Sequence, residues 1–414
     1  MIMYNNLSVK DNIATISYRL MRFFFVFYIL FFPLGIAFRE IGSCGAAIGL
    51  FFYYSTNYRT SNLKKWKLKW IYFIFILYLI VNSFFVSINV HESWYAISHN
   101  LYKGFILIFA GIEFIRSPKD LQVLVVAFAI MGFYEGLDGV FQAILGYDLV
   151  QGTKLSDWGR LTGSLSTPRV GNLMSLIVPI AAGSYFIIKN YCRITVAFII
   201  YLILLIPPIF LLHGAKARSG WFGFFIAIIA FIYIRYGWNF KKTIVLLLFV
   251  ASILIFGPDR INIKTLSSAP RLELWHTALK IFTHYPVFGS GFNTYPNAFN
   301  KLGIIHQKNS NQIPHPHNIY CQFLAEGGII GFTLLMLFLF GNLLWSLKKI
   351  RLLLEYDYHN YFLIIFFWSS YAGYLMTAFS AHNYFRTWWL GMAMSIIGVV
   401  LGGCTLIQRE ENGN

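Results

Sequence analysis

The stretch RITVAFIIYLILLIPPIFLLH, residues 193–213, decides the fold of this chain. Arg193 and His213 close its two ends, and no charged residue stands between them. An α-helix rises about 1.5 Å per residue, so about 20 apolar residues cross the roughly 30 Å hydrocarbon core of a bilayer. We therefore predict that this run is a membrane-spanning helix and that the chain is an integral membrane protein.

Composition agrees with that prediction over the whole chain. Of the 414 residues, 57% are hydrophobic and only 12% are charged, and the mean hydropathy is +0.61. A soluble globular domain carries about 25% charged residues, and no soluble core of this size would enclose so much apolar surface. The sequence therefore excludes a soluble enzyme, and its long apolar runs predict an all-α membrane fold.

Basic residues give the chain a formal net charge of +17. They do not gather on one element with interleaved aromatic residues, as a nucleic-acid site requires. They stand in short clusters between apolar runs, as membrane topology signals do. We therefore predict contact with membrane lipids and no nucleic-acid partner. The four cysteines lack metal-ligand spacing and are predicted to be buried free thiols; they are Cys44, Cys192, Cys321 and Cys404.

About twelve apolar segments are able to span a bilayer. The predicted spans are, in order, 20–38, 41–55, 70–88, 100–115, 121–145, 170–188, 193–213, 219–237, 242–258, 319–347, 361–381 and 385–407. They divide the chain into residues 1–258 with transmembrane helices one to nine, residues 259–318 as one long loop with an amphipathic helix, and residues 319–414 with transmembrane helices ten to twelve and a cytoplasmic tail.

Charge asymmetry sets the predicted orientation. With the N-terminus in the cytoplasm, more than half of the 33 lysines and arginines fall in the inside segments, as the positive-inside rule requires. Twelve spans then place both termini in the cytoplasm and the loop 259–318 outside. In that loop Leu272, Trp275, Leu279 and Phe282 recur at helical spacing, which predicts an amphipathic helix with these residues on its apolar face.

A tight turn between the seventh and eighth spans, Gly214-Ala215-Lys216-Ala217-Arg218, carries the first candidate site. Arg218 would begin the eighth span, where free N–H groups and the helix dipole favour anions. A guanidinium there can hold a phosphate through two hydrogen bonds. The alternative is an interfacial anchor whose charged end reaches the lipid headgroups.

Two further candidates fall on the same predicted side. Arg271 opens the amphipathic helix, where a cation is mildly unfavourable unless it has an anionic partner; the alternative is a solvated helix-end charge. His317 stands at the mouth of the tenth span and is a natural general base, with Asn318 or a carbonyl fixing its tautomer. The alternatives are a metal-ligand pair with His315, which would need more ligands, or an interfacial histidine.

A fourth candidate precedes the sixth span. Arg160 and Arg169 flank small and hydroxyl residues that could line a phosphate or sugar site; an ordinary polar loop is the alternative. No Asp-x-Asp pair lies on the predicted outer side, so the sequence predicts no metal site of the kind that nucleotide-sugar enzymes use. No Walker-type loop is present, so ATP is not used directly.

These motifs together make the chain resemble the O-antigen ligase family, within the superfamily of bacterial membrane glycosyltransferases that also holds O-antigen polymerases. Ala217 stands where many members have Ser, and no catalytic role is assigned to that hydroxyl. The residues that carry the resemblance are Ala217-Arg218-Ser219-Gly220-Trp221, Arg271 with Trp275, Pro286 with Gly289-Ser290-Gly291, and His317-Asn318 followed by Glu326-Gly327-Gly328, with Asp138 to Gln142 and Arg160 to Gly163 upstream.

The resemblance implies a reaction at the periplasmic face of the bacterial inner membrane, in lipopolysaccharide biosynthesis. A glycan carried on undecaprenyl diphosphate would be transferred to a sugar hydroxyl of lipid A-core, without cofactor or metal and with inversion. We predict that Arg218 and Arg271 stabilise the leaving diphosphate and that His317 is the base. Substrate binding is predicted for Arg160, Lys216, Arg169, His315 and Asn318.

Two alternatives stay open at this point. A polysaccharide polymerase would use the same residues on a lipid-linked acceptor. A transporter or flippase would place ionisable residues at mid-bilayer, and Glu135 and Asp138 in the fifth span are consistent with that class.

Overall fold

The computed structural model describes residues 9–237, 244, 271–304, 315–379 and 387–406. Within these ranges the chain is all-helical, and its only β-structure is two isolated bridges. The α-helices are α1 (Val9–Phe31), α2 (Ile36–Asn57), α3 (Lys69–Phe85), α4 (Val90–Tyr95), α5 (Tyr102–Phe114), α6 (Pro118–Leu145), α7 (Val170–Ala182), α8 (Ser184–Ile188), α9 (Ile194–Gly214), α10 (Arg218–Tyr236), α13 (Arg271–His284), α14 (Tyr295–Lys301), α15 (Ile319–Met336), α16 (Asn342–Tyr361), α17 (Ile364–Thr377) and α18 (Thr387–Cys404).

Seven helical segments of the described chain are long and apolar enough to cross a membrane. They lie at Asp11–Leu34, Ile36–Thr60, Pro118–Leu145, Val170–Ile188, Ile194–Gly214, Arg218–Tyr236 and Ile319–Tyr361. This confirms an all-helical protein with several candidate spans. The shorter helices α3, α5, α17 and α18 lie where the sequence predicts spans, and the predicted span 242–258 is outside the described residues apart from Ile244.

The first predicted span, residues 20–38, is wrong in its bounds. α1 begins already at Val9 and ends at Phe31, and a short 3-10 turn (Phe32–Leu34) with Gly35 at φ 144° leads into α2. Polar residues in the first half of α1 lower its local hydropathy, although that half buries Ala14 and Ser17 at helical spacing. A hydropathy window therefore misses the start of α1 and runs across the Pro33 turn into α2.

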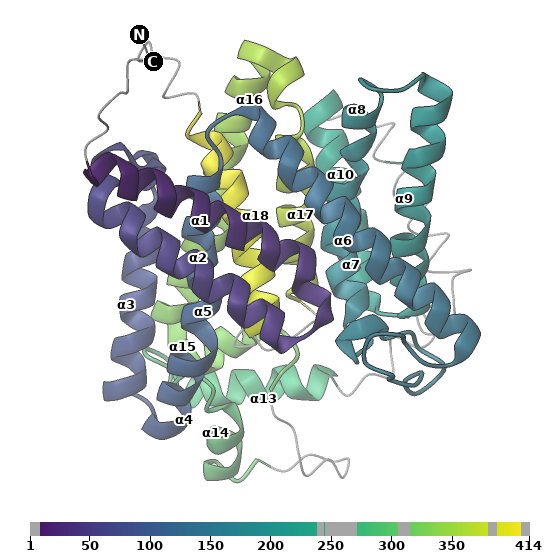
Figure 1. Ribbon diagram of the computed structural model, residues 1–414. Helices are drawn as coiled ribbons and strands as arrows, with labels where there is room; N and C mark the ends of the chain where they lie inside the picture. Colours follow the sequence, from purple (N-terminus) through teal and green to yellow (C-terminus); the bar gives the residue numbers. More distant parts are fainter. Residues whose placement is uncertain (1–8, 238–243, 245–270, 305–314, 380–386, 407–414) are drawn as a thin grey trace.

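The helices pack into one bundle around α17 and α18 (Figure 1). α18 lies along α5, and α17 lies against α7, α10 and α18. α10 and α17 approach closely because glycines face each other: a Cβ on Gly373 would lie 2.6 Å from the carbonyl oxygen of Gly223. Small residues at such contacts let helix backbones approach where lipid supplies no hydrophobic drive.

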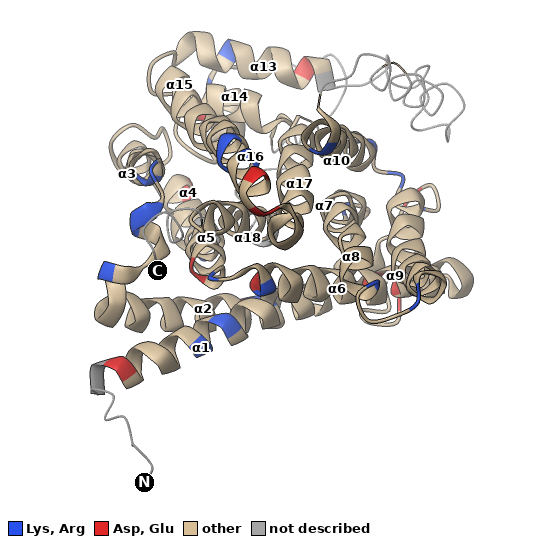
Figure 2. Ribbon diagram, turned by 90° about the horizontal axis from the view of Figure 1, so that it is seen from above, with Lys and Arg blue, Asp and Glu red and all other residues tan. Residues whose placement is uncertain are grey.

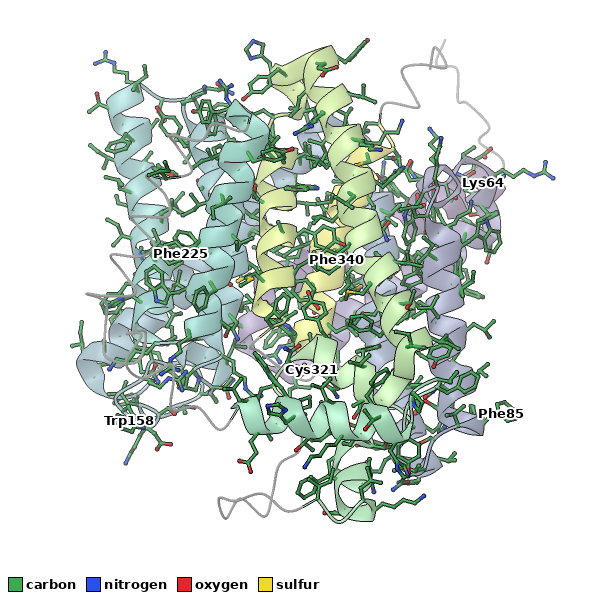
Figure 3. The ribbon with its side chains drawn as sticks, turned by 180° about the vertical axis from the view of Figure 1, so that it is seen from behind. Lys64, Phe85, Trp158, Phe225, Cys321 and Phe340 are labelled. Atoms are coloured by element: carbon green, nitrogen blue, oxygen red, sulfur yellow. The ribbon has the colours of Figure 1, made fainter. Side chains whose placement is uncertain are left out.

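The described loops gather at two opposite ends of the bundle. Lys64 lies at one end, whereas Phe85, Trp158 and the short helices α13 and α14 lie at or near the other (Figures 1 and 3). Figure 2, which looks down on the bundle from the first of these ends, marks where its charged residues lie along the helices. Trp158, α13 and α14, which belong to segments that the sequence predicts to lie on the outer side, therefore share one end of the molecule.

The four cysteines are free thiols, as predicted, but only Cys404 is buried. Cys192 and Cys321 are half-buried, and Cys44 is exposed on α2. The prediction of burial was wrong for Cys44 and Cys321 because apolar helices also present part of their surface outward, and wrong for Cys192 because it lies in the turn between α8 and α9.

Candidate active site

The turn between α9 and α10 is a cationic cluster. Lys216 adopts the left-handed region at φ 48° and donates from its Nζ to the carbonyl oxygen of Trp158 at 3.0 Å. Arg160 donates from its Nε to the carbonyl oxygen of Ala215 at 2.9 Å. Arg218 follows two residues after Lys216 as the first residue of α10 and is half-buried. The fold therefore brings together three of the predicted site residues, Arg160, Lys216 and Arg218.

Arg169 lies at the N-terminus of α7, beside the start of α10. The Oγ of Ser219 donates to the Oδ1 of Asn172 at 2.7 Å, so the first turns of α7 and α10 are in contact. A Cβ on Gly220 would lie 2.6 Å from the carbonyl oxygen of Gly171, which explains the glycine of this motif. Two helix N-termini, each with an arginine at its first residue or cap, therefore stand side by side, an arrangement that favours an anion.

The loop that carries Arg160 is held by Gln142 of α6. The Gln142 Nε2 donates to the Thr153 carbonyl at 3.0 Å and to the Thr162 Oγ1 at 2.8 Å, and its Oε1 accepts from the Thr162 and Gly163 amides at 2.8 and 3.1 Å. Gln142 is fully buried, so these four bonds replace the water that the amide group would otherwise bind.

Glu135 and Asp138, about two turns and one turn before Gln142 on α6, have the same structural role. Glu135 accepts from the amide of Ser164 at 3.1 Å and from its hydroxyl, and Asp138 accepts from the amide of Leu149 at 2.8 Å. Both carboxyls are thus bonded to residues of the loop that follows α6. The sequence analysis did not assign this structural role to them. The signal was present, since residues 135, 138 and 142 share one face of the mostly apolar second half of α6.

The histidine segment lies at the start of α15. The rings of His315 and His317 are 4.3 Å apart between centroids; His315 is buried, and His317 is half-buried with φ at 52°. Asn318 caps α15, because its Oδ1 accepts from the amides of Tyr320 at 2.9 Å and Cys321 at 3.2 Å. The cap directs the chain so that His317 stands immediately before the first turn of α15.

α17 connects the histidine segment to the cationic cluster. The amide of Ile319 donates to the carbonyl of Ala378 at 3.0 Å, directly after the end of α17. One residue earlier, Thr377 lies so close to α10 that a Cβ on Gly223 would be 2.4 Å from its Cγ2. Gly223 is five residues after Arg218, so His317 and Arg218 lie at the same end of the packed α10–α17 pair.

Arg271 is the first residue of α13, as the sequence predicts. α13 crosses this end of the bundle with its first turn toward α10 (Figures 1 and 2). It is tied to the histidine segment by Trp275, whose Nε1 donates to the carbonyl of Pro316 at 3.2 Å. The start of α13 is thus joined to the residue that precedes His317.

Comparison with known proteins identifies this region. Residues 200–336 match the family model described as O-antigen ligase. The chain contains an O-antigen ligase domain. The predicted resemblance is therefore confirmed, and enzymes of this family transfer lipid-linked glycans. No curated protein matches the chain. The matched residues include Arg218, Arg271 and His317, whose catalytic roles stay predictions.

Gly289 and Gly328 of the O-antigen ligase domain pack closely together where α15 is kinked. Gly328 has φ 60° and ψ −166°, and the amide of Ile329 donates to the carbonyl of Pro286 at 2.9 Å. Gly289, at φ 77°, lies so close to α15 that its Cβ would be 2.2 Å from the Glu326 carbonyl oxygen. The two glycine motifs that the sequence analysis treated separately are therefore the two sides of one contact.

α13 uses a different face from the predicted one. Leu272 and Leu279, predicted for its buried side, are 59% and 46% exposed. The buried residues are Leu274, Thr277, Ala278 and Ile281, of which Ala278 and Ile281 share a small core with α14 and α15. The small side chain of Ala278 permits close packing against α15, and hydropathy alone does not register that advantage.

Two apolar cavities open along the described helices. One, of about 530 Å³, lies between α7, α9, α10 and α17 and begins near Ile209 and Phe224, within two helical turns of Lys216 and Arg218. The other, of about 520 Å³, lies between α2, α3 and α5. Among the described residues no three His, Cys, Asp or Glu side chains are grouped as metal ligands.

Proposed function

We propose that this chain is an O-antigen ligase-like glycosyltransferase. It moves a glycan from undecaprenyl diphosphate to a sugar hydroxyl of lipid A-core at the periplasmic face of the bacterial inner membrane. The observation that supports the proposal is that Arg218 and the segment of His317, both within the residues that match the O-antigen ligase model, lie at the same end of the packed α10–α17 pair.

The chemistry of transfer suits these residue types. The acceptor hydroxyl oxygen attacks the anomeric carbon, the bond from that carbon to the diphosphate oxygen breaks, and undecaprenyl diphosphate leaves with the bonding electron pair. His317 takes the hydroxyl proton. Arg218, with Arg271, Arg160 and Lys216, stabilises the charge that develops on the diphosphate. Direct displacement inverts the anomeric centre, and guanidinium groups take the place of a metal ion.

The cavity between α7, α9, α10 and α17 suits the prenyl chain of such a donor. It is lined mostly by apolar and aromatic side chains, among them Phe224 and Ile228 of α10, the helix that Arg218 begins. A donor with its chain in this cavity would have its diphosphate near the cationic turn. Burial of the chain supplies affinity from apolar area, and the cations supply orientation.

A polymerase with the same site is the second candidate, because the O-antigen ligase family domain is shared by ligases and polymerases. The two differ in acceptor, so a deletion strain separates them: unattached long polymer indicates a ligase, and core carrying a single repeat indicates a polymerase. The transporter alternative rested on Glu135 and Asp138 as ionisable residues at mid-bilayer. Both residues instead bind the loop that carries Arg160, so they no longer favour that alternative.

The test is glycan transfer by the purified protein with defined donor and acceptor lipids. We expect His317→Ala and Arg218→Ala each to lower the rate about 10²- to 10⁴-fold. Matched controls are His359→Ala and Arg193→Ala, exposed residues at other helix ends, Arg193 being the N-cap of α9; both should transfer at the wild-type rate.

Unchanged transfer by either site variant would remove that residue's role. Transfer that stops on addition of EDTA and returns with a divalent cation would contradict the metal-independent mechanism. Glycan movement across a vesicle membrane without covalent transfer would replace the proposal with transport.

A further inference from the structure

A buried carboxyl group on α15 holds the start of α14. Glu326 is fully buried, and its oxygens accept from the amides of Asn293 at 3.0 Å and Tyr295 at 2.9 Å and from the Nε2 of Gln322 at 3.0 Å. Its own carbonyl accepts from the amide of Gly291 at 2.9 Å. Burial of a carboxyl group is unfavourable unless its oxygens are hydrogen-bonded, so these bonds fix where α14 begins.

Tyr295 extends this arrangement to α13. Its side chain is fully buried, and its hydroxyl donates to the carbonyl of Leu274 at 2.9 Å, three residues after Arg271. Burial raises the pKa of the Tyr295 phenol, so the group keeps the proton that it donates. Tyr295 also packs with Ala278, Ala298 and Ala325, so its ring has little freedom to move.

The residue after Leu274 completes a closed circuit. Trp275 donates to the carbonyl of Pro316, and Pro316 precedes His317, which leads into α15. From Glu326 the contacts run through α14 and the first turn of α13 to the histidine segment and return along α15. Displacement of any one of these segments changes its position relative to the others.

We propose that Tyr295 is a positioning residue for the glycan transfer. Glu326 holds the backbone of Tyr295 through its amide, and the Tyr295 hydroxyl fixes the first turn of α13, which begins with Arg271, against the segment of His317. This inference rests on the proposed function, because it assigns Tyr295 to the geometry of that reaction. A displacement of about 1 Å at a catalytic group can cost on the order of 100-fold in rate, so loss of one hydroxyl would act on turnover.

The experiment compares Tyr295→Phe with Tyr72→Phe. Tyr72 is also buried, and its hydroxyl also donates to a backbone carbonyl, that of Phe105 at 3.2 Å, within the helical bundle. We expect Tyr295→Phe to lower kcat at least tenfold, with the donor KM within about threefold of wild type, and Tyr72→Phe to keep the wild-type kcat. The two variants should have the same unfolding midpoint in detergent.

Hydrogen exchange provides a readout that does not depend on transfer. We expect backbone amides in residues 272–284 to exchange faster in Tyr295→Phe than in wild type, and those in α18 to be unchanged. Wild-type kcat in Tyr295→Phe would overturn the proposal. A lower kcat accompanied by a lower unfolding midpoint than that of Tyr72→Phe would also overturn it, because general destabilisation would then explain the loss. A wild-type protein that transfers no glycan contradicts the proposed function, and the exchange result then still tests the contact itself.

Discussion

Replacement of Gly328 by alanine tests the interlock between α15 and the segment before α14. Gly328 has a backbone conformation, φ 60° and ψ −166°, that is essentially restricted to glycine. A Cβ there would lie 2.4 Å from the carbonyl oxygen of Val287 and 2.5 Å from the amide nitrogen of Gly289. Both neighbours are backbone atoms, so one of the two segments must move.

The cost follows from those contacts. The strained conformation alone costs about 1–3 kcal/mol in a residue with a side chain. Movement of residues 287–289 also loses the bond from the Ile329 amide to the Pro286 carbonyl, and a buried hydrogen bond contributes about 1 kcal/mol. We therefore expect Gly328→Ala to lower the free energy of unfolding by about 3 kcal/mol and to reduce glycan transfer at least tenfold, because the displaced segment leads into α14.

Gly341→Ala is the matched control, since Gly341 is in the same long helical segment and has no heavy atom within 4 Å of the position that an added Cβ would take. Alanine there should leave transfer unchanged and leave stability equal or slightly higher, as alanine favours helix by about 1 kcal/mol over glycine. The measurement is the folded fraction remaining in detergent over a temperature series, followed by transfer rates. Equal stability and equal activity in the two variants would refute the interlock.

Two further predictions address the cavity and the loop. Ile228→Trp, which fills the cavity between α7, α9, α10 and α17, should raise the KM for a long-chain donor about tenfold. That change is about 1.4 kcal/mol, the equivalent of about two buried methylenes. Ile76→Trp, in the cavity between α2, α3 and α5, should leave this KM unchanged, and equal effects of the two variants on initial rates would contradict the assignment. Gln142→Leu should lower the transfer rate at least tenfold, because two buried amides lose their acceptor at about 1–3 kcal/mol each and the loop bearing Arg160 loosens. The exposed control Gln151→Leu should keep the wild-type transfer rate. Wild-type transfer by Gln142→Leu would show that the loop is held by other contacts.

Hydropathy predicted which parts of the chain are helical but not at which residues each helix begins and ends. The apolar run at α9 has bounds within one residue of the predicted ones, because polar residues stand at both of its ends. The first span was displaced, because α1 begins among polar residues that its exposed face tolerates and ends at Phe31, just before Pro33, within an apolar stretch. A window average detects how apolar a whole stretch is, whereas helix ends are set by single residues.

Site prediction shows the same division. The sequence located Arg218 at the start of α10 and Arg271 at the start of α13, because helix starts have local signals. It treated Asn318 as a substrate ligand or tautomer partner, although an Asn before an apolar helix is also a common N-cap, which is the role that its hydrogen bonds give it. Buried Glu326 could not be assigned, because two of its three partners are the backbone amides of Asn293 and Tyr295, and backbone amides have no side-chain signature in the sequence.

The relation between the cationic turn and His317 depends on α17, a helix without any predicted site residue. α17 contacts α10 through Gly373 and binds the start of α15 through the carbonyl of Ala378. Bulk at the glycine contact would change the distance between the two halves of the site, since both are anchored on the same helix. Sequence motifs predict which residues bind the substrate, but the spacing between those residues is set by such backbone contacts between apolar helices. The distance between the cationic turn and His317 is therefore a property of the helix packing that the motifs alone do not predict.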